Sequence, residues 1–195
     1  MKIIDITQEL LACKVYPGDP KPQVQPLSSM KNGGLYNLSA LSFCAHNGTH
    51  VDAPAHFLKD GKTIDQLPLG SFVGDCVVLH HNGMVAGQDA VAMLETMKNY
   101  GTTERLLIAG NAVVTAEAAR VFAASDLKLV GNESQSVGPE EAPMEVHLIL
   151  LQREIVLLEG IVLDGVKEGR YFLSAAPLNA VGLEGAPCRA YLIER

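Results

Sequence analysis

Three histidines and one aspartate lie within a string of eleven residues: His46, His50, Asp52 and His56. Imidazole nitrogen and carboxylate oxygen are the usual ligands of a catalytic Zn²⁺ or a similar divalent ion. The chain has 6 histidines in all, so half of them fall inside this one window. Because so many ionisable groups are costly to bury unless something organises them, the string predicts a metal site.

The residues between these side chains favour their convergence. Gly48 allows the backbone a sharp turn between His46 and His50. His50 and Asp52 are two positions apart, so an extended segment would project both side chains to the same side.

The elements that must position this string can be predicted from the pattern of apolar residues. The expected strands are 3–6, 35–44, 72–80, 105–109, 127–130, 155–158, 171–175 and 189–193, and the expected helices are 88–100, 116–124 and 144–152. Strand-rich ends around a helix–strand–helix–strand middle indicate an α/β fold with a mixed sheet, in a single domain over residues 1–195. Residues 22–34 have no clear period and end in a turn, so we expect a long mobile loop there.

Composition narrows the class of protein. The chain has 195 residues and a net charge of −7, from 15 Lys and Arg against 22 Asp and Glu. An acidic chain lacks the basic footprint that nucleic acids and anionic membranes attract, so neither is an expected partner. No apolar stretch is long enough to span a membrane, and the N-terminus does not resemble a signal peptide. The 4 cysteines form no CxxC pair and are typical of reduced thiols, which favours a cytoplasmic protein.

The string from His46 to His56 has the form HxGTHxDxPxH, and all seven fixed positions of that motif match. In this the chain resembles the metal-dependent cyclase family, which includes bacterial kynurenine formamidase and isatin hydrolase. Two further stretches extend the resemblance. One is HxxLLxxxIxxxE, in which Glu159 follows His147 by twelve residues, and the other is a closing PLxxxGxxGxPxRA pattern at 177–190.

Membership of this family would imply a swivelling β/β/α-type fold, a homodimer or homotetramer, and one or two divalent ions, zinc or manganese, in each subunit. The residues that the resemblance assigns are His46, His50 and Asp52 on one ion, Asp52 with His147 and Glu159 on or near the other, and His56 for proton transfer. Taken alone, His147 is more typical of a structural residue, and Glu159 could equally end a strand at the surface. The family usually has Asp where this chain has Glu133, so the role of residues 131–136 stays open.

Elementary chemistry agrees with this division of roles. Asp52 is the only carboxylate inside the string, and a carboxylate can bridge two cations where a neutral imidazole cannot. A bound ion lowers the pKa of its water to about 7, which supplies hydroxide for hydrolysis at neutral pH. Amide hydrolysis also needs a proton on the departing nitrogen, and His56 could relay it. The sequence therefore predicts a metal-dependent hydrolase that uses a metal-activated water to open a small cyclic or N-acyl amide.

Two alternatives remain open on the same residues. The first is another reaction at the same metal site, such as lactone opening, cyclisation or dehydration. The second is a non-catalytic metal-binding protein, although a pure binding site has no need for a further, non-ligating imidazole such as His56.

Tyr16 bears on the substrate. In the kynurenine formamidase branch of the family, the matching loop carries a Trp that contacts the aromatic substrate, whereas this chain has Tyr16 there and no Trp anywhere. We therefore expect Tyr16 to contact the substrate, and we expect a smaller or more polar acyl amide, imide or lactone in place of N-formylkynurenine. An exposed Tyr16 without substrate contact is the alternative.

Overall fold

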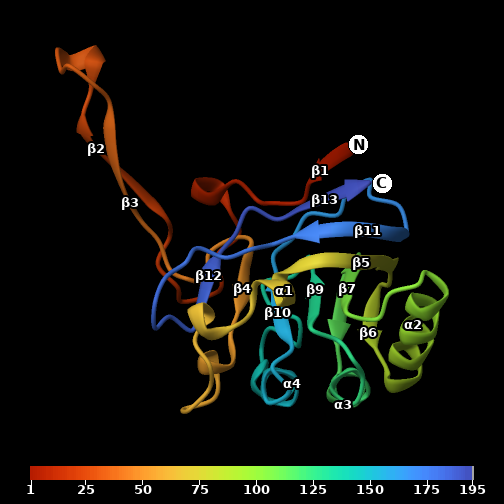
Figure 1. Cartoon of the computed structure of the whole chain (residues 1–195). Coiled ribbons are helices and arrows are strands. Elements are labelled where there is room, and N and C mark those ends of the chain that lie inside the picture. The colour runs from red at the N-terminus through yellow and green to blue at the C-terminus, as the bar shows by residue number, and fades with distance from the viewer. Residues whose placement is uncertain (195) are drawn as a thin grey trace.

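A nine-stranded mixed sheet forms the body of the chain (Figure 1) in the computed structural model, which describes residues 1–194. The strands follow one another across the sheet in the order β1–β13–β11–β5–β7–β9–β10–β4–β12. Their bounds are β1 Lys2–Asp5, β13 Tyr191–Glu194, β11 Gly169–Ser174, β5 Val73–His80, β7 Arg105–Ala109, β9 Leu129–Asn132, β10 Val156–Glu159, β4 His50–Asp52 and β12 Gly185–Pro187. The predicted α/β fold with a mixed sheet is confirmed.

The central four strands, β5, β7, β9 and β10, run parallel to one another, and helices connect them along the chain. The helices are α2 Gly87–Asn99, α3 Ala116–Ala123 and α4 Met144–Leu151, preceded by the short α1 Leu69–Phe72. Thr115 begins α3, because its hydroxyl accepts a hydrogen bond from the Ala118 backbone N–H. The remaining strands are antiparallel and extend the sheet on both sides.

Each face of the sheet buries its own set of apolar side chains. Phe122, Met97 and Leu150 lie between the helices and the sheet, in one fully buried cluster. Phe72 and Leu173 belong to a second cluster on the other face. Strands with both faces covered read as continuous apolar runs, which is why β7 and β10 were predictable from the sequence.

Residues 23–42 form a hairpin that stands apart from the body (Figure 1). Its strands are β2, Gln23–Ser28, and β3, Leu38–Ser42, with a single 3₁₀ turn at Met30–Asn32 between them. The expectation of a loop over 22–34 was therefore wrong, and the strand expected over 35–44 is exposed on both faces. The pattern misled because neither face of β2 packs on this chain, so burial imposes no alternation of apolar and polar residues.

The other elements are short. Strands β6 (Gly83–Val85) and β8 (Ala112–Val114) pair in parallel beside the helices. Single 3₁₀ turns occupy Leu10–Ala12, Pro54–His56 and Ile64–Gln66. Among residues 1–194, no helix has the length and apolar character needed to cross a membrane.

Candidate metal centre

Strand β4 carries the centre of the His-rich string, and its two neighbours complete the surroundings. In the antiparallel register of β4 and β10, Glu159 lies directly opposite His50. Side chains of such a cross-strand pair lie on the same face, so Glu159 is brought to the string from over a hundred residues away. Helix α4 packs on β10 and supplies His147. The sequence-predicted ligands are thus gathered at one place.

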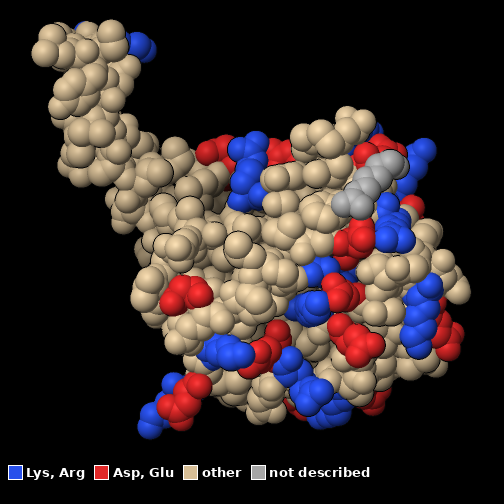
Figure 2. Space-filling model, viewed as in Figure 1, with Lys and Arg blue, Asp and Glu red and all other residues tan. Residues whose placement is uncertain are grey.

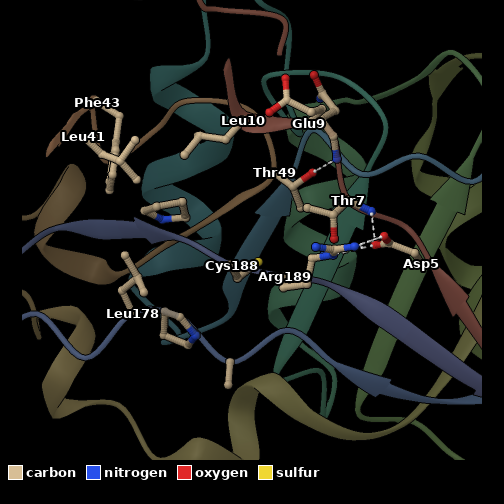
Figure 3. Close-up of a pocket in the computed structure, with 14 residues that line it drawn as sticks. Asp5, Thr7, Glu9, Leu10, Leu41, Phe43, Thr49, Leu178, Cys188 and Arg189 are labelled. Atoms are coloured by element: carbon tan, nitrogen blue, oxygen red, sulfur yellow. Dashed lines mark hydrogen bonds and ion pairs between the residues drawn. The ribbon is translucent and has the colours of Figure 1, made fainter. Parts of the chain in front are cut away.

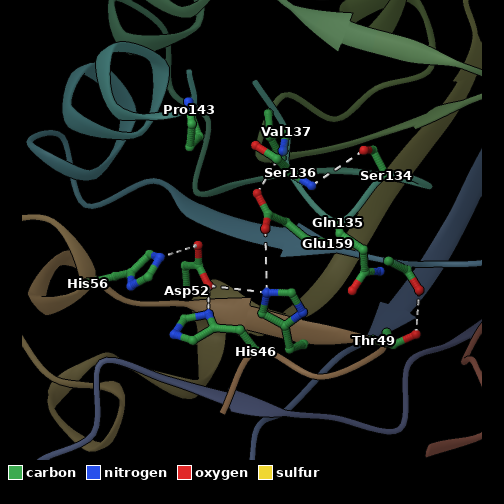
Figure 4. A network of polar contacts seen from close by, with 12 residues as sticks. His46, Thr49, Asp52, His56, Ser134, Gln135, Ser136, Val137, Pro143 and Glu159 are labelled. Carbon is green, nitrogen blue, oxygen red and sulfur yellow. Dashed lines mark hydrogen bonds and ion pairs between the residues drawn. The ribbon is translucent and has the colours of Figure 1, made fainter. Parts of the chain in front are cut away.

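Asp52 is the hub of the cluster (Figure 4). Its Oδ1 lies 2.8 Å from His46 Nδ1 and 3.5 Å from His50 Nε2. Its Oδ2 lies 3.5 Å from His147 Nε2 and 3.9 Å from His56 Nε2. Four imidazoles therefore surround one carboxylate.

Glu159 closes the cluster on the side of β10. Its Oε2 lies 3.4 Å from His50 Nε2, and its Oε1 lies 3.3 Å from His147 Nε2. The same Oε1 accepts a hydrogen bond of 2.7 Å from the Val137 backbone N–H, which fixes the carboxylate in place. The two buried carboxylates thus face each other across the same pair of imidazoles.

Hydrogen bonds to the backbone orient two of the histidines. His50 Nδ1 lies 3.0 Å from the Gly48 carbonyl oxygen, and His147 Nδ1 lies 2.9 Å from that of Pro143. When these nitrogens donate to the carbonyls, each Nε2 is left with a lone pair aimed at the carboxylates, as in histidines that bind metals. His46 departs from this pattern, since its Nε2 lies 3.3 Å from Glu184 Oε1.

Two glycines shape the space around the string. Gly48 has a φ of 64°, in the left-handed region, and makes the sharp turn that the sequence predicts between His46 and His50. Gly185, opposite Asp52 in the β4–β12 register, leaves room for an imidazole, because a Cβ there would lie 2.8 Å from His46 Cε1.

The cluster is buried, and its charges perturb one another. Burial lowers the pKa of a histidine, but Asp52 and the other carboxylates outweigh it, raising the pKa of His46 to about 9 and that of His147 to about 10. Burial raises the pKa of Asp52, but the neighbouring imidazoles of His147 and His46 outweigh this effect and hold the pKa well below its usual range. The pKa of Glu159 is lowered by the same kind of contact, and that of His50 is raised.

These residues fit a divalent cation. Asp52 is fully buried and its Oδ2 has no hydrogen-bond partner among the described residues, although an unsatisfied buried carboxylate is expensive. Nitrogen and carboxylate oxygens from His50, Asp52 and Glu159 lie within 4.8 Å of one another, and so do those of His46, Asp52 and His56. This grouping differs from the one that the family resemblance implies, because it places His50 with Glu159 and brings His56 within ligand range.

His56 is the most exposed of the four imidazoles, with 27% of its side chain accessible against 2–3% for His50 and His147. Its ring stacks on that of His46 at 4.1 Å and meets the edge of Phe57 at 4.5 Å. Burial lowers the pKa of His56, so that it titrates below an ordinary histidine. A partly exposed imidazole at the mouth of the cluster can exchange protons with solvent.

Other predicted or overlooked residues surround the cluster. The Tyr16 hydroxyl donates a hydrogen bond to the Glu140 carbonyl, on the loop that leads from Val137 to Pro143, so its contact with substrate stays a prediction. Glu133 accepts hydrogen bonds from the Gly110 and Leu163 backbone N–H groups and so ties two loops together. Glu184 lies beside His46 and was not among the predicted site residues, although it falls between two fixed glycines of the closing pattern.

A cavity of about 720 Å³ lies near the centre but does not include it (Figure 3). Its walls include Leu10, Leu41, Phe43 and Leu178. Thr49, which belongs to the His-rich string, also lines the cavity. The Thr49 hydroxyl donates to the Gly160 carbonyl and accepts from the Gln8 backbone N–H. None of the predicted ligands lines this cavity.

Comparison with known proteins identifies a matching family model and two similar enzymes that share one name. The Cyclase family model matches residues 4–139. A kynurenine formamidase of Erythrobacter litoralis is 33% identical over 99% of this chain and 94% of its own length. A kynurenine formamidase of Salinibacter ruber is 35% identical over 98% of this chain and 97% of its own.

Solved structures agree. A protein described as a potential metal-dependent hydrolase with cyclase activity superposes with a TM-score of 0.82, at 26% identity over 100% of this chain and 98% of its own. Isatin hydrolase A of Labrenzia aggregata has a TM-score of 0.83 at 20% identity, covering 100% of this chain and 94% of its own, and shares the fold.

Proposed function

Because this chain belongs to the cyclase family, we propose that it is a metal-dependent hydrolase that opens a small cyclic or N-acyl amide. The reaction breaks a C–N bond other than a peptide bond. The centre that carries it is the cluster around Asp52, and the ligands we assign are His46, His50, Asp52, His147 and Glu159. The ion we expect is zinc or manganese, as one or two ions per subunit.

The observation that carries this proposal is the environment of the Asp52 carboxylate. A fully buried carboxylate with an unpartnered oxygen stands among four imidazoles and faces a second buried carboxylate, Glu159. A purely structural site would satisfy that oxygen with a hydrogen-bond donor. Two carboxylates held this close in a buried site favour positive charge between them.

A bound divalent ion would polarise the substrate carbonyl and lower the pKa of a coordinated water to about 7. The chain itself supplies the proton transfer. His56 lies at the exposed side of the cluster, and its lowered pKa keeps it largely neutral near pH 7, ready to accept a proton. It can then deliver that proton to the departing nitrogen, while Phe57 holds its ring from one side.

Metal content tests the proposal first. We expect purified protein to contain zinc or manganese, and His50→Ala and Asp52→Ala to lose most of it. His80→Ala, an imidazole outside the cluster that bonds the Val166 carbonyl, is the matched control and should keep it. Full metal stoichiometry in both cluster variants would refute the assignment.

A substrate screen then tests the reaction. Small N-acyl amides, cyclic amides, imides and lactones are supplied to the metal-loaded protein, and to Asp52→Ala as the blank. Hydrolysis of an amide supports the proposal, seen as a separate acid and amine from an N-acyl amide or as one ring-opened product from a cyclic amide. Turnover of lactones alone, or a dehydration without amide cleavage, would replace it with the corresponding reaction at the same centre.

A further inference from the structure

Glu184 is an acidic side chain at the edge of the metal centre that the proposed set of ligands does not use. Its Oε1 lies 3.3 Å from His46 Nε2. The other ring nitrogen, His46 Nδ1, lies 2.8 Å from Asp52 Oδ1. His46 is thus held between two carboxylates, with one on each nitrogen.

We propose that Glu184 orients His46 for the metal ion, so that His46 donates its Nε2–H to the Glu184 carboxylate and binds the ion through Nδ1. This inference rests on the proposed function, because it requires the cluster to hold a divalent ion. A carboxylate behind a metal-binding histidine fixes which nitrogen carries the proton and makes the other nitrogen a stronger ligand. Glu184 is therefore a positioning residue and not a further ligand.

The side of the ring that faces the ion follows from where the other ligand atoms gather. Asp52 Oδ1, next to His46 Nδ1, also lies 3.5 Å from His50 Nε2. The candidate ligand atoms of His46, Asp52 and His56 lie within 4.8 Å of one another, and no such group among residues 1–194 includes Glu184. The ion is therefore expected on the Nδ1 side, which leaves Nε2 to carry the proton.

The exposure of the two carboxylates agrees with this division. The Asp52 side chain is fully buried, whereas that of Glu184 is 41% exposed. A buried carboxylate has lost its water and needs a cation nearby, while a half-exposed one keeps part of its hydration. Asp52 thus suits a direct ligand, and Glu184 suits a hydrogen-bond acceptor at the edge of the site.

The charge of Glu184 is not taken up by a basic side chain. Acidic residues lie beside basic ones on the face of the body seen in Figure 2, and Glu145, for example, pairs with Arg120 at 2.7 Å. Among residues 1–194, no Lys or Arg forms an ion pair with Glu184, whose partner is His46. Its carboxylate is thus directed at the imidazole.

The backbone fixes Glu184 relative to the ligands. The Glu184 carbonyl accepts a hydrogen bond of 2.8 Å from the N–H of Ala53, the residue that follows Asp52. The Leu183 carbonyl accepts another of 2.8 Å from the Ile64 N–H. Because the chain around Glu184 is tied to the end of β4, its carboxylate and that of Asp52 keep a constant separation across His46.

Packing alone does not decide which way the His46 ring faces. The ring stacks on His56 at 4.1 Å and fits against Gly185, which fixes its plane. A half-turn of the ring would keep that plane but exchange nitrogen for carbon on both sides. Glu184 and Asp52 together favour the one orientation in which each nitrogen has a carboxylate partner.

Zinc affinity tests the role of Glu184 without any substrate. In competition titrations of chelator-treated protein near neutral pH, we expect Glu184→Ala to bind zinc about 10–100-fold more weakly than the wild type. Glu184→Gln should be intermediate, because its amide oxygen can still accept the Nε2–H bond without the charge. It also keeps the shape of the side chain, so a folding defect would not explain its weaker binding.

Glu145→Ala is the matched control, since it removes the same charge from an exposed ion pair with Arg120, and it should bind zinc as the wild type does. Wild-type affinity in Glu184→Ala would overturn the inference. So would an equal loss in Glu145→Ala, because the effect would then come from net charge alone.

Nuclear magnetic resonance of the imidazole nitrogens tests the orientation directly. In zinc-loaded protein labelled with ¹⁵N-histidine, His46, assigned by the loss of its signals in His46→Asn, should carry its proton on Nε2 and bind zinc through Nδ1. In Glu184→Ala the Nε2–H signal should shift and broaden, because the proton then exchanges with water. Zinc on Nε2 in the wild type, or an unchanged Nε2–H signal in Glu184→Ala, would overturn the inference. A wild type that binds no zinc or manganese would refute the proposed function as well, whereas the other adverse outcomes refute the role of Glu184 alone.

Discussion

Metal binding to this protein should release protons and strengthen steeply with pH. The carboxylates of Asp52 and Glu159 hold protons on the imidazoles around them, so that the pKa of His46 is about 9 and that of His147 about 10. A metal ion binds only the neutral imidazole. At pH 7 an ion that uses these ligands must therefore displace the protons first.

The magnitude follows from the distance of each pKa from the working pH. Each pKa unit above pH 7 costs about 1.4 kcal/mol, which is about 3 kcal/mol for His46 and about 4 kcal/mol for His147. While both remain protonated, the apparent affinity should rise up to about a hundredfold for each pH unit. The pKa of His50 is also raised, which acts in the same direction.

Isothermal titration of manganese or zinc into chelator-treated protein measures both quantities. Titrations between pH 6.5 and 8.5, in buffers of different ionisation enthalpy, should give about two protons released and an affinity that increases with pH. Asp52→Asn removes the charge that holds the protons, so its titration should be weaker and less dependent on pH. His80→Gln is the control and should match the wild type. An affinity independent of pH, with no proton released, would refute this account of the cluster.

Three further results are expected. His56→Ala should lose roughly 10²–10⁴-fold in turnover at unchanged metal content, the range for a positioned acid or base; loss of the metal by elemental analysis would instead make His56 a ligand. N-Formylkynurenine should be a poor substrate, with kcat/KM below about 10⁴ M⁻¹s⁻¹, because Tyr16 replaces an indole; an efficient reaction would contradict this. The Tm of chelator-treated protein should fall as pH rises from 7 to 10. The raised pKa values of His46 and His147 mean that their protonated forms stabilise the fold, and this stabilisation is lost as they lose their protons. A constant Tm over this range would contradict the expectation.

The local part of the site was readable from the residues alone. His50 and Asp52 point to the same side because a strand alternates with a period of two, and Gly48 turns the chain before them because its φ is positive. These relations involve neighbours in the chain, so no knowledge of the rest of the fold was required. The central strands and helices were predictable for the same reason, since burial on both faces or on one stripe leaves a clear pattern.

Contacts between distant segments required the folded chain. Glu159 meets His50 only because β10 pairs with β4 in one antiparallel register, and a shift by one residue would turn its carboxylate to the other face. Glu184 directly precedes β12, which pairs with β4 on the side opposite β10, and this pairing places Glu184 beside His46. The strand expected over 35–44 contains β3, but β2 and its pairing with β3 escaped prediction. Sequence patterns record burial within a chain, and neither face of β2 is buried by its own chain.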